Sequence, residues 1–121
     1  MSEPVTIIRK PIHLEAVRWF RNGDHPQDKV GEMLVDPLTD TMYPREEGAV
    51  VRYYRHPHLR GDHMHHCGHL YHDHGFIDNF NGGHRICPGD WIITDENGGH
   101  FPVTDEHFRH LYEIIDLSVP R

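Results

Sequence analysis

Short runs of β-branched and aromatic residues, separated by turn-forming residues, recur along most of the chain. Runs of this length with alternating apolar and polar positions are typical of β-strands, and Gly, Pro and Asn between them indicate turns. The strands expected from this pattern span residues 5–8, 12–20, 49–54, 75–80, 84–87, 91–94, 100–103 and 112–117. The run at 91–94 continues the strand at 84–87 beyond a kink at Pro88-Gly89. Strands are therefore expected to dominate the fold.

Two segments favour helix instead. Residues 105–111 follow Thr104, a good N-cap residue, and residues 28–34 begin with Asp28 as a cap. Residues 36–48, polar and with two prolines, favour a loop. These elements predict one domain over residues 1–121, of β-rich α+β class. Its sheet is expected to be small, antiparallel and partly rolled into a barrel-like shape. About five to seven strands and one or two short helices complete the prediction.

The last predicted helix and strand carry most of the apolar side chains near the end of the chain. Phe108 and Leu111 are three residues apart, which places them on one face of a helix. We therefore expect this closing segment to pack against the sheet, with these side chains largely buried: Phe101, Phe108, Leu111, Tyr112 and Ile114.

Composition limits the classes of function. Only 36% of the residues are hydrophobic, so the core is small, and a structural metal often stabilises such domains. There is no long apolar run and no signal-peptide pattern, which favours a cytoplasmic protein without a membrane span. A net charge of −7 disfavours nucleic acid as a partner. Arginines interleaved with tyrosines in residues 52–60 keep nucleic acid as an alternative.

The chemistry of the sequence is concentrated between His56 and Cys87. Eight of the fourteen histidines lie between His56 and His74, and both cysteines, Cys67 and Cys87, lie within or just after that cluster. Imidazole and thiolate are the preferred ligands of Zn²⁺. A long irregular segment such as 56–73 is uncommon in a small domain unless something holds it, and ligation of a metal would do so.

One structural zinc ion of Cys2His2 type is the predicted cofactor. Cys67 and Cys87 are the preferred ligands, and the second pair is open among four histidines: His69, His72, His74 and His84. His72 and His74 would share one face of an incoming strand, while the Gly82-Gly83 turn would bring Cys87 back towards His74. The alternative is a polar loop with surface histidines and two buried free cysteines.

A second interpretation of the histidines is a cupin-like metal enzyme. His63-x-His65, the turn Pro88-Gly89-Asp90 and His100 follow the order of a cupin metal site. The glutamate expected at the usual offset is missing, and Asp73 and Asp78 are the candidate substitutes. Such a site would keep one coordination position open to water, whereas a structural zinc has four protein ligands.

Segments at both ends of the chain resemble a family of small proteins of unassigned function from bacteriophages, especially those of actinobacteria. The resemblance rests on residues 87–94, which contain the run Pro88-Gly89-Asp90-Trp91-Ile92-Ile93, and on residues 9–19, 75–78, 82–84, 99–108 and 112–113. It implies a phage origin and the cytoplasm of a bacterial host, but no particular chemistry. Together with the zinc prediction, it favours a zinc-stabilised phage accessory protein that binds a protein of the host or the phage without catalysis.

Overall fold

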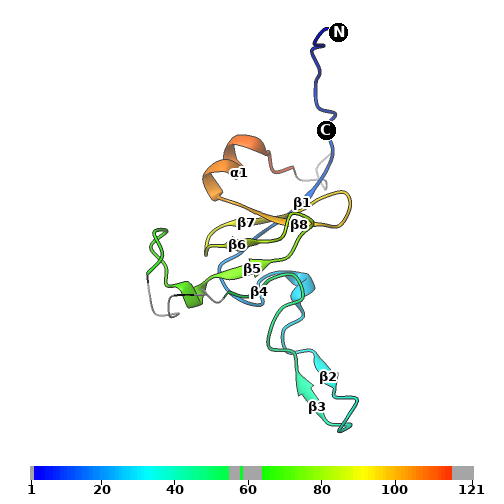
Figure 1. Cartoon of the computed structure of the whole chain (residues 1–121), viewed down its shortest axis with the longest axis vertical. Coiled ribbons are helices and arrows are strands. Elements are labelled where there is room, and N and C mark those ends of the chain that lie inside the picture. The colour runs from blue at the N-terminus through cyan, green and yellow to red at the C-terminus, as the bar shows by residue number, and fades with distance from the viewer. Residues whose placement is uncertain (1, 55–57, 59–63, 116–121) are drawn as a thin grey trace.

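The protein, seen here in a computed structural model, is α+β and rich in strands (Figure 1). The structure describes residues 2–54, 58 and 64–115. Its strands are β1 (Glu15–Arg18), β2 (Met33–Val35), β3 (Met42–Pro44), β4 (Arg52–Tyr53), β5 (Gly75–Ile77), β6 (His84–Ile86), β7 (Trp91–Thr94) and β8 (His100–Val103). Its helices are the 3-10 turns η1 (Pro26–Asp28) and η2 (Tyr71–Asp73) and the α-helix α1 (Asp105–Leu111).

The eight strands of the described residues form three separate antiparallel sheets. Two have three strands, in the orders β1-β7-β8 and β4-β5-β6, and the third is the hairpin β2-β3. The fold class is as predicted, but the sheets do not close into a barrel. The single sheet that was expected is divided into three, and the ladder between β4 and β5 is only two residues long.

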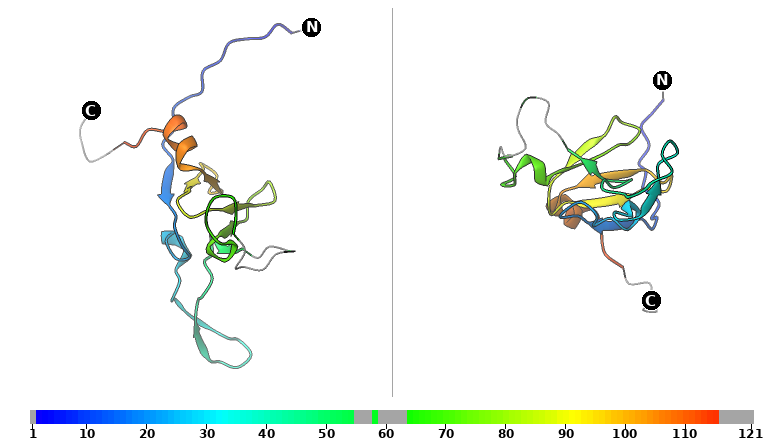
Figure 2. Two further views of the ribbon diagram at one scale, coloured as in Figure 1. Left: turned by 90° about the vertical axis from the view of Figure 1, so that its left-hand side faces the viewer. Right: turned by 90° about the horizontal axis from the view of Figure 1, so that it is seen from below.

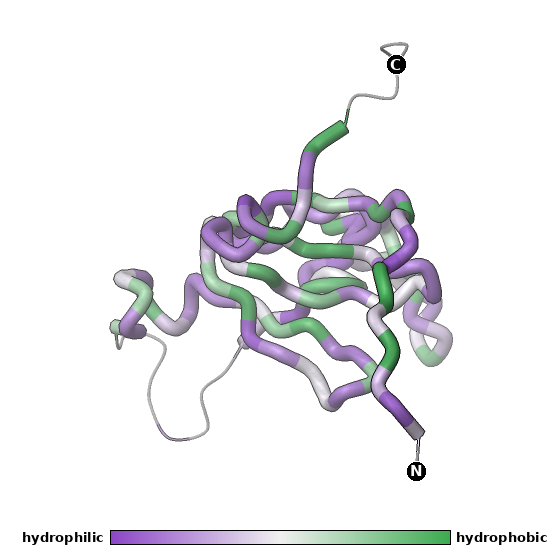
Figure 3. Tube along the Cα trace, turned by 90° about the horizontal axis from the view of Figure 1, so that it is seen from above, coloured by the Kyte–Doolittle hydropathy of each residue, from purple (hydrophilic) through white to green (hydrophobic). Residues whose placement is uncertain are grey.

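The aliphatic core lies between the two three-stranded sheets. Ile92 on β7 and Trp19 just after β1 meet Ile77 and Ile86 of the other sheet, and none of the four is more than 1% exposed. Because side chains alternate along a strand, Trp91 and Ile93 face the opposite side of β7, where α1 lies. Figure 2 shows the layers from two further directions, and Figure 3 shows the apolar stretches gathered in the strands of the body.

Helix α1 begins as the sequence predicts. The Thr104 hydroxyl accepts the His107 N–H at 3.2 Å, and the ring of Phe108 stacks on Trp91 with centroids 3.9 Å apart. Phe108 is buried, but Leu111 and Ile114 are 68% and 72% exposed, so the expected burial of the whole segment was wrong. Residues 112–115 form no strand, and residues 116–117 of the predicted strand lie outside the described residues.

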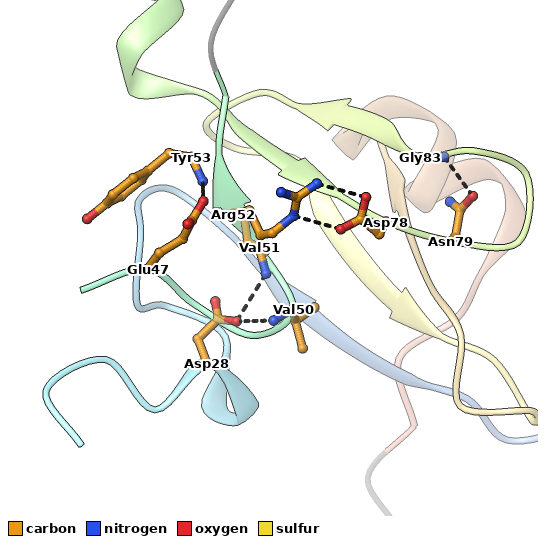
Figure 4. A network of polar contacts seen from close by, with 9 residues as sticks. All are labelled: Asp28, Glu47, Val50, Val51, Arg52, Tyr53, Asp78, Asn79 and Gly83. Carbon is orange, nitrogen blue, oxygen red and sulfur yellow. Dashed lines mark hydrogen bonds and ion pairs between the residues drawn. The ribbon is translucent and has the colours of Figure 1, made fainter. Parts of the chain in front are cut away.

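The predicted helix at 28–34 does not form. Lys29 has a left-handed φ of 51°, which ends η1, and the chain turns into β2 at Met33. The Asp28 carboxylate does not cap a helix, because it accepts the buried N–H groups of Val50 at 2.6 Å and Val51 at 3.0 Å (Figure 4). A fully buried carboxylate thus holds the chain before β4, whose predicted range of 49–54 shortens to two residues.

Two other segments differ from the prediction. Within the predicted loop 36–48, β3 pairs with β2 to form a hairpin that projects from the body (Figure 1). The predicted strand at 5–8 is absent, since residues 2–10 run extended and exposed, without a pairing strand among the described residues. In both places the outcome was set by whether a partner strand was available, which local sequence does not specify.

Candidate metal centre

Four side chains converge beside the end of the β5-β6 sheet: His65, Cys67, His74 and Cys87. One ligand atom from each lies within 4.8 Å of the others. Both imidazoles are buried, Cys87 is half-buried, and Cys67 lies nearest to solvent. Two thiols and two imidazoles are the donor set of a Cys2His2 zinc site, and this group could hold a metal ion.

A tight turn brings His65 and Cys67 together. The Gly68 N–H donates to the His65 carbonyl at 3.0 Å, and the His65 N–H donates to the His69 carbonyl at 2.8 Å. Gly68 has a φ of +91°, which glycine adopts without strain. The His65 Nδ1 accepts the Cys67 N–H at 3.2 Å, while its Nε2 is buried without a hydrogen-bond partner among the described residues. Because Nδ1 accepts, the ring proton of the neutral imidazole lies on Nε2. A metal bound at Nε2 would therefore move that proton to Nδ1 and replace the bond from the Cys67 N–H.

The 3-10 turn η2 delivers His74 to the group. The His74 N–H donates to the Tyr71 carbonyl at 3.1 Å, and the ring Nδ1 lies 2.7 Å from the Leu70 carbonyl oxygen. Because a carbonyl oxygen only accepts, Nδ1 carries the ring proton and Nε2 keeps its lone pair. That Nε2 lies 3.1 Å from the Cys67 Sγ. Zinc-bound histidines usually donate their other ring N–H to such a carbonyl or a carboxylate, which fixes the tautomer.

Cys87 enters the group from the turn that follows β6. Its N–H donates to an Asp90 carboxylate oxygen at 3.0 Å, and its carbonyl accepts the Asp90 N–H at 3.0 Å. The turn is tied to the core, because the Gly89 N–H donates to the Trp19 carbonyl at 2.7 Å. The Pro88-Gly89-Asp90 turn therefore places one thiol against the body of the protein. The other three side chains come from residues 64–74.

Burial shifts the pKa values of three side chains of the group. Burial lowers the pKa of His65 to about 4, and nearby Arg85 adds to that effect. Burial also lowers the pKa of His74, although its bond to Leu70 opposes the shift. Burial raises the pKa of the Cys87 thiol to about 12, with Cys67 and Asp90 adding to it. Both imidazoles are thus uncharged at pH 7, and a metal would have to displace the thiol proton of Cys87.

Arg85 on β6 lies close enough to the group to affect its electrostatics. Its guanidinium lies 5.4 Å from the ring centroid of Tyr54 and 5.9 Å from that of Tyr71. The positive charge favours the thiolate form of Cys87, against the effect of burial. Two thiolates would neutralise a divalent ion, so the loaded group would bury no net charge of its own.

The structure brings three of the six predicted ligands together and leaves three elsewhere. Cys67, His74 and Cys87 belong to the group, while His69, His72 and His84 lie outside it and are exposed. His72 does not share a strand face with His74, because η2 turns it outwards to the Asp73 carboxylate at 3.3 Å. His65 takes the remaining place. The spacing His65-x-Cys67 in the sequence could have indicated that His65 is a ligand. His65 was instead assigned to the cupin-like pair His63-x-His65.

Among the described residues, those of the cupin interpretation form no second metal-ligand cluster, although His65, Asp90 and His100 line one pocket. His63 lies outside the described residues, and His65 belongs to the Cys2His2 group. His100 bonds the Thr94 hydroxyl at 2.9 Å and packs edge-on against His25. The two candidate carboxylates are also engaged, since Asp73 pairs with His72 and Asp78 with Arg52.

Of the arginine and tyrosine residues considered for nucleic acid, the described Arg52 is ion-paired and Tyr54 is packed. Arg52 donates twice to the Asp78 carboxylate, at 2.6 and 2.9 Å (Figure 4), and Tyr54 packs against Arg85. Arg55 and Arg60 lie outside the described residues. This strand therefore presents a paired charge in place of the free cation that a phosphate would need.

Comparison with known proteins finds no matching family model, no similar curated protein and no similar solved structure. The resemblance to the phage family thus stays a prediction. No helix formed by the described part of the chain has the length and apolar character needed to cross a bilayer.

Proposed function

We propose that this protein is a zinc-stabilised, non-enzymatic binding module, acting as a phage accessory protein in the cytoplasm of a bacterial host. The observation that carries the zinc proposal is the group His65, Cys67, His74 and Cys87. It joins the loop of residues 64–74 to the turn after β6 through a donor set that suits Zn²⁺. Four protein ligands complete a tetrahedral shell, which leaves no position for water or substrate and argues against catalysis.

The support for a binding role is the β2-β3 hairpin. Its apolar side chains are exposed: Met33, Val35, Leu38, Met42 and Tyr43. Exposed apolar clusters on projecting elements are where proteins dock, and methionines adapt to partner surfaces. Three carboxylates against one arginine in residues 32–45 favour a protein partner whose apolar surface has a basic rim. The partner is expected to be a component of the host or the phage.

Exchange of the bound metal for Co²⁺ tests the zinc proposal. The tag-free protein should take up about one Co²⁺ per chain and show thiolate-to-cobalt absorption, with visible bands of tetrahedral intensity. His74→Ala and Cys87→Ser should lose tight binding. His72→Ala, a histidine of the same turn that faces solvent, is the matched control and should bind as the wild type does.

Two results would contradict the proposal. The first is cobalt binding without a thiolate band, which would place the metal away from the cysteines. The second is weak, five-coordinate bands, which would indicate a site open to water and favour the cupin-like enzyme instead.

A further inference from the structure

The first 14 residues include an apolar segment and one wall of an apolar groove, and neither the segment nor the groove is covered by another part of the described chain. We name residues 2–8 the arm. It carries Val5, Ile7 and Ile8, which are 79%, 83% and 92% exposed. The arm leaves the body near α1 and runs away from it (Figures 1 and 2). Three exposed β-branched side chains within four residues are unusual for a segment that remains in water.

The groove lies between the base of the arm, the outer face of β7 and helix α1. We name it the α1 groove. It has a volume of about 500 Å³, and most of its lining is apolar. Ile12 and Leu14 form one wall, and Leu111 and Ile114 form the other. Leu111 and Ile114 are exposed, so the groove presents to solvent the side chains that were expected to be buried.

We propose that a second copy of this chain fills the α1 groove with its arm, and that two copies exchange arms in a symmetric dimer. The arm offers the apolar side chains that the groove lacks. The charges also match, since the single charged residue of the arm is Glu3, whereas Arg9 and Lys10 lie in the groove wall against one carboxylate, Glu113. The proposal does not depend on the metal centre.

The geometry favours exchange over folding back. Residues 9–14 already form a wall of the groove, so the arm would have to reverse within residues 8–11 to enter its own groove. Pro11 restricts Lys10 to extended conformations, which disfavours a tight reversal there. An arm that continues away from its own body can instead enter the α1 groove of a second copy of the chain. Because each chain supplies both an arm and a groove, the contact is self-complementary and closes as a two-fold dimer.

Sedimentation velocity of the full, tag-free chain tests the exchange. Across a roughly hundredfold range of concentration, the mass should rise from that of one chain towards that of two. Ile7→Asp in the arm and Leu111→Asp in the groove should each raise the dissociation constant at least about tenfold. Leu38→Asp is the matched control, because Leu38 is 93% exposed on the β2-β3 hairpin, and it should dimerise as the wild type does.

A mixture of the two variants provides the decisive measurement. Ile7→Asp keeps an intact groove and Leu111→Asp keeps an intact arm, so the mixture should form a heterodimer through one exchanged arm. If Leu111→Asp loses its circular dichroism spectrum, Ile114→Asp replaces it as the groove variant. A wild type that stays monomeric throughout would overturn the proposal and leave the groove to another protein. A dimer that tolerates either charge substitution would also overturn it.

Discussion

The body of the protein and its histidine-cysteine loop are stabilised by different contacts. In the body, Trp19, Ile77, Ile86 and Ile92 exclude water between two sheets. In the loop of residues 64–74, the buried side chains are His65 and His74, and the apolar Met64 is exposed. Burial of apolar surface stabilises the first region. The second buries polar atoms, so its stability depends on what those atoms bind, and we attribute that role to a metal.

Removal of the metal should therefore affect the two regions very differently. Hydrogen exchange followed by mass spectrometry should show peptides from residues 64–74 exchanging at least about tenfold faster after chelation. Peptides from β7 and β8 should change little, because their ladder and core do not include the metal group. Cys87→Ser should reproduce the effect of the chelator. Equal acceleration in both regions would mean that the loop and the body unfold together.

A core substitution should destabilise the body of the protein whether or not metal is bound. Phe108→Ala removes a ring that is 5% exposed and stacked on Trp91, and it should lower the free energy of unfolding by about 3–5 kcal/mol. The loss should be the same with and without metal. Leu111→Ala, on the exposed side of α1, is the control and should change stability by less than about 1 kcal/mol under monomeric conditions. Urea denaturation of both variants would measure the difference.

Buried hydrogen bonds also occur in the body, where one oxygen of the Asp28 carboxylate accepts two backbone N–H groups. Asp28→Ala would leave the Val50 and Val51 N–H groups without their acceptor, at a cost of about 2–3 kcal/mol. Asp36→Ala removes a similar acceptor from the exposed Leu38 N–H and should cost less than about 1 kcal/mol. Equal losses in thermal unfolding would show that Asp28 is not a structural anchor.

The smallest expected effect concerns pH. Hydrogen bonds from Trp91 and Arg109 hold the pKa of Asp105 below its ordinary value. A depressed carboxyl pKa contributes stability above the unfolded pKa, and that stability is lost as the pH falls through the folded value. The melting temperatures of wild type and Asp105→Asn should therefore differ most at neutral pH and converge as the pH falls below about 4. A gap that stays constant would mean that the charge of Asp105 is not involved.

The sequence was a good guide where local signals act together. The bounds of β7, β8 and α1 are those predicted, since turns at Pro88-Gly89 and Gly98-Gly99 and the Thr104 cap mark their ends. It failed where a distant partner decides the structure. Asp28 accepts from residues more than twenty positions away, and residues 5–8 have strand-forming side chains but no described strand beside them.

The candidate site was accessible from sequence in part. The Gly82-Gly83 turn and strand pairing were enough to place Cys87 near His74. The choice among the histidines depended on two turns that periodicity does not reveal. The turn at His65–Gly68 brings His65 to Cys67, and η2 separates His72 from His74. The composition therefore indicated the types of ligand, histidine and cysteine. Which histidines take part depends on how the backbone turns at His65–Gly68 and in η2.

Elemental analysis of tag-free protein, purified without added metal, measures whether the group His65, Cys67, His74 and Cys87 holds zinc. We expect about one zinc per chain in the wild type and in His72→Ala, and little in Cys87→Ser or His65→Ala. The last variant is the sharpest, because His65 enters the ligand set only through the structure. A zinc-free wild type that is as stable as zinc-treated protein would contradict the account, as would full zinc content in His65→Ala.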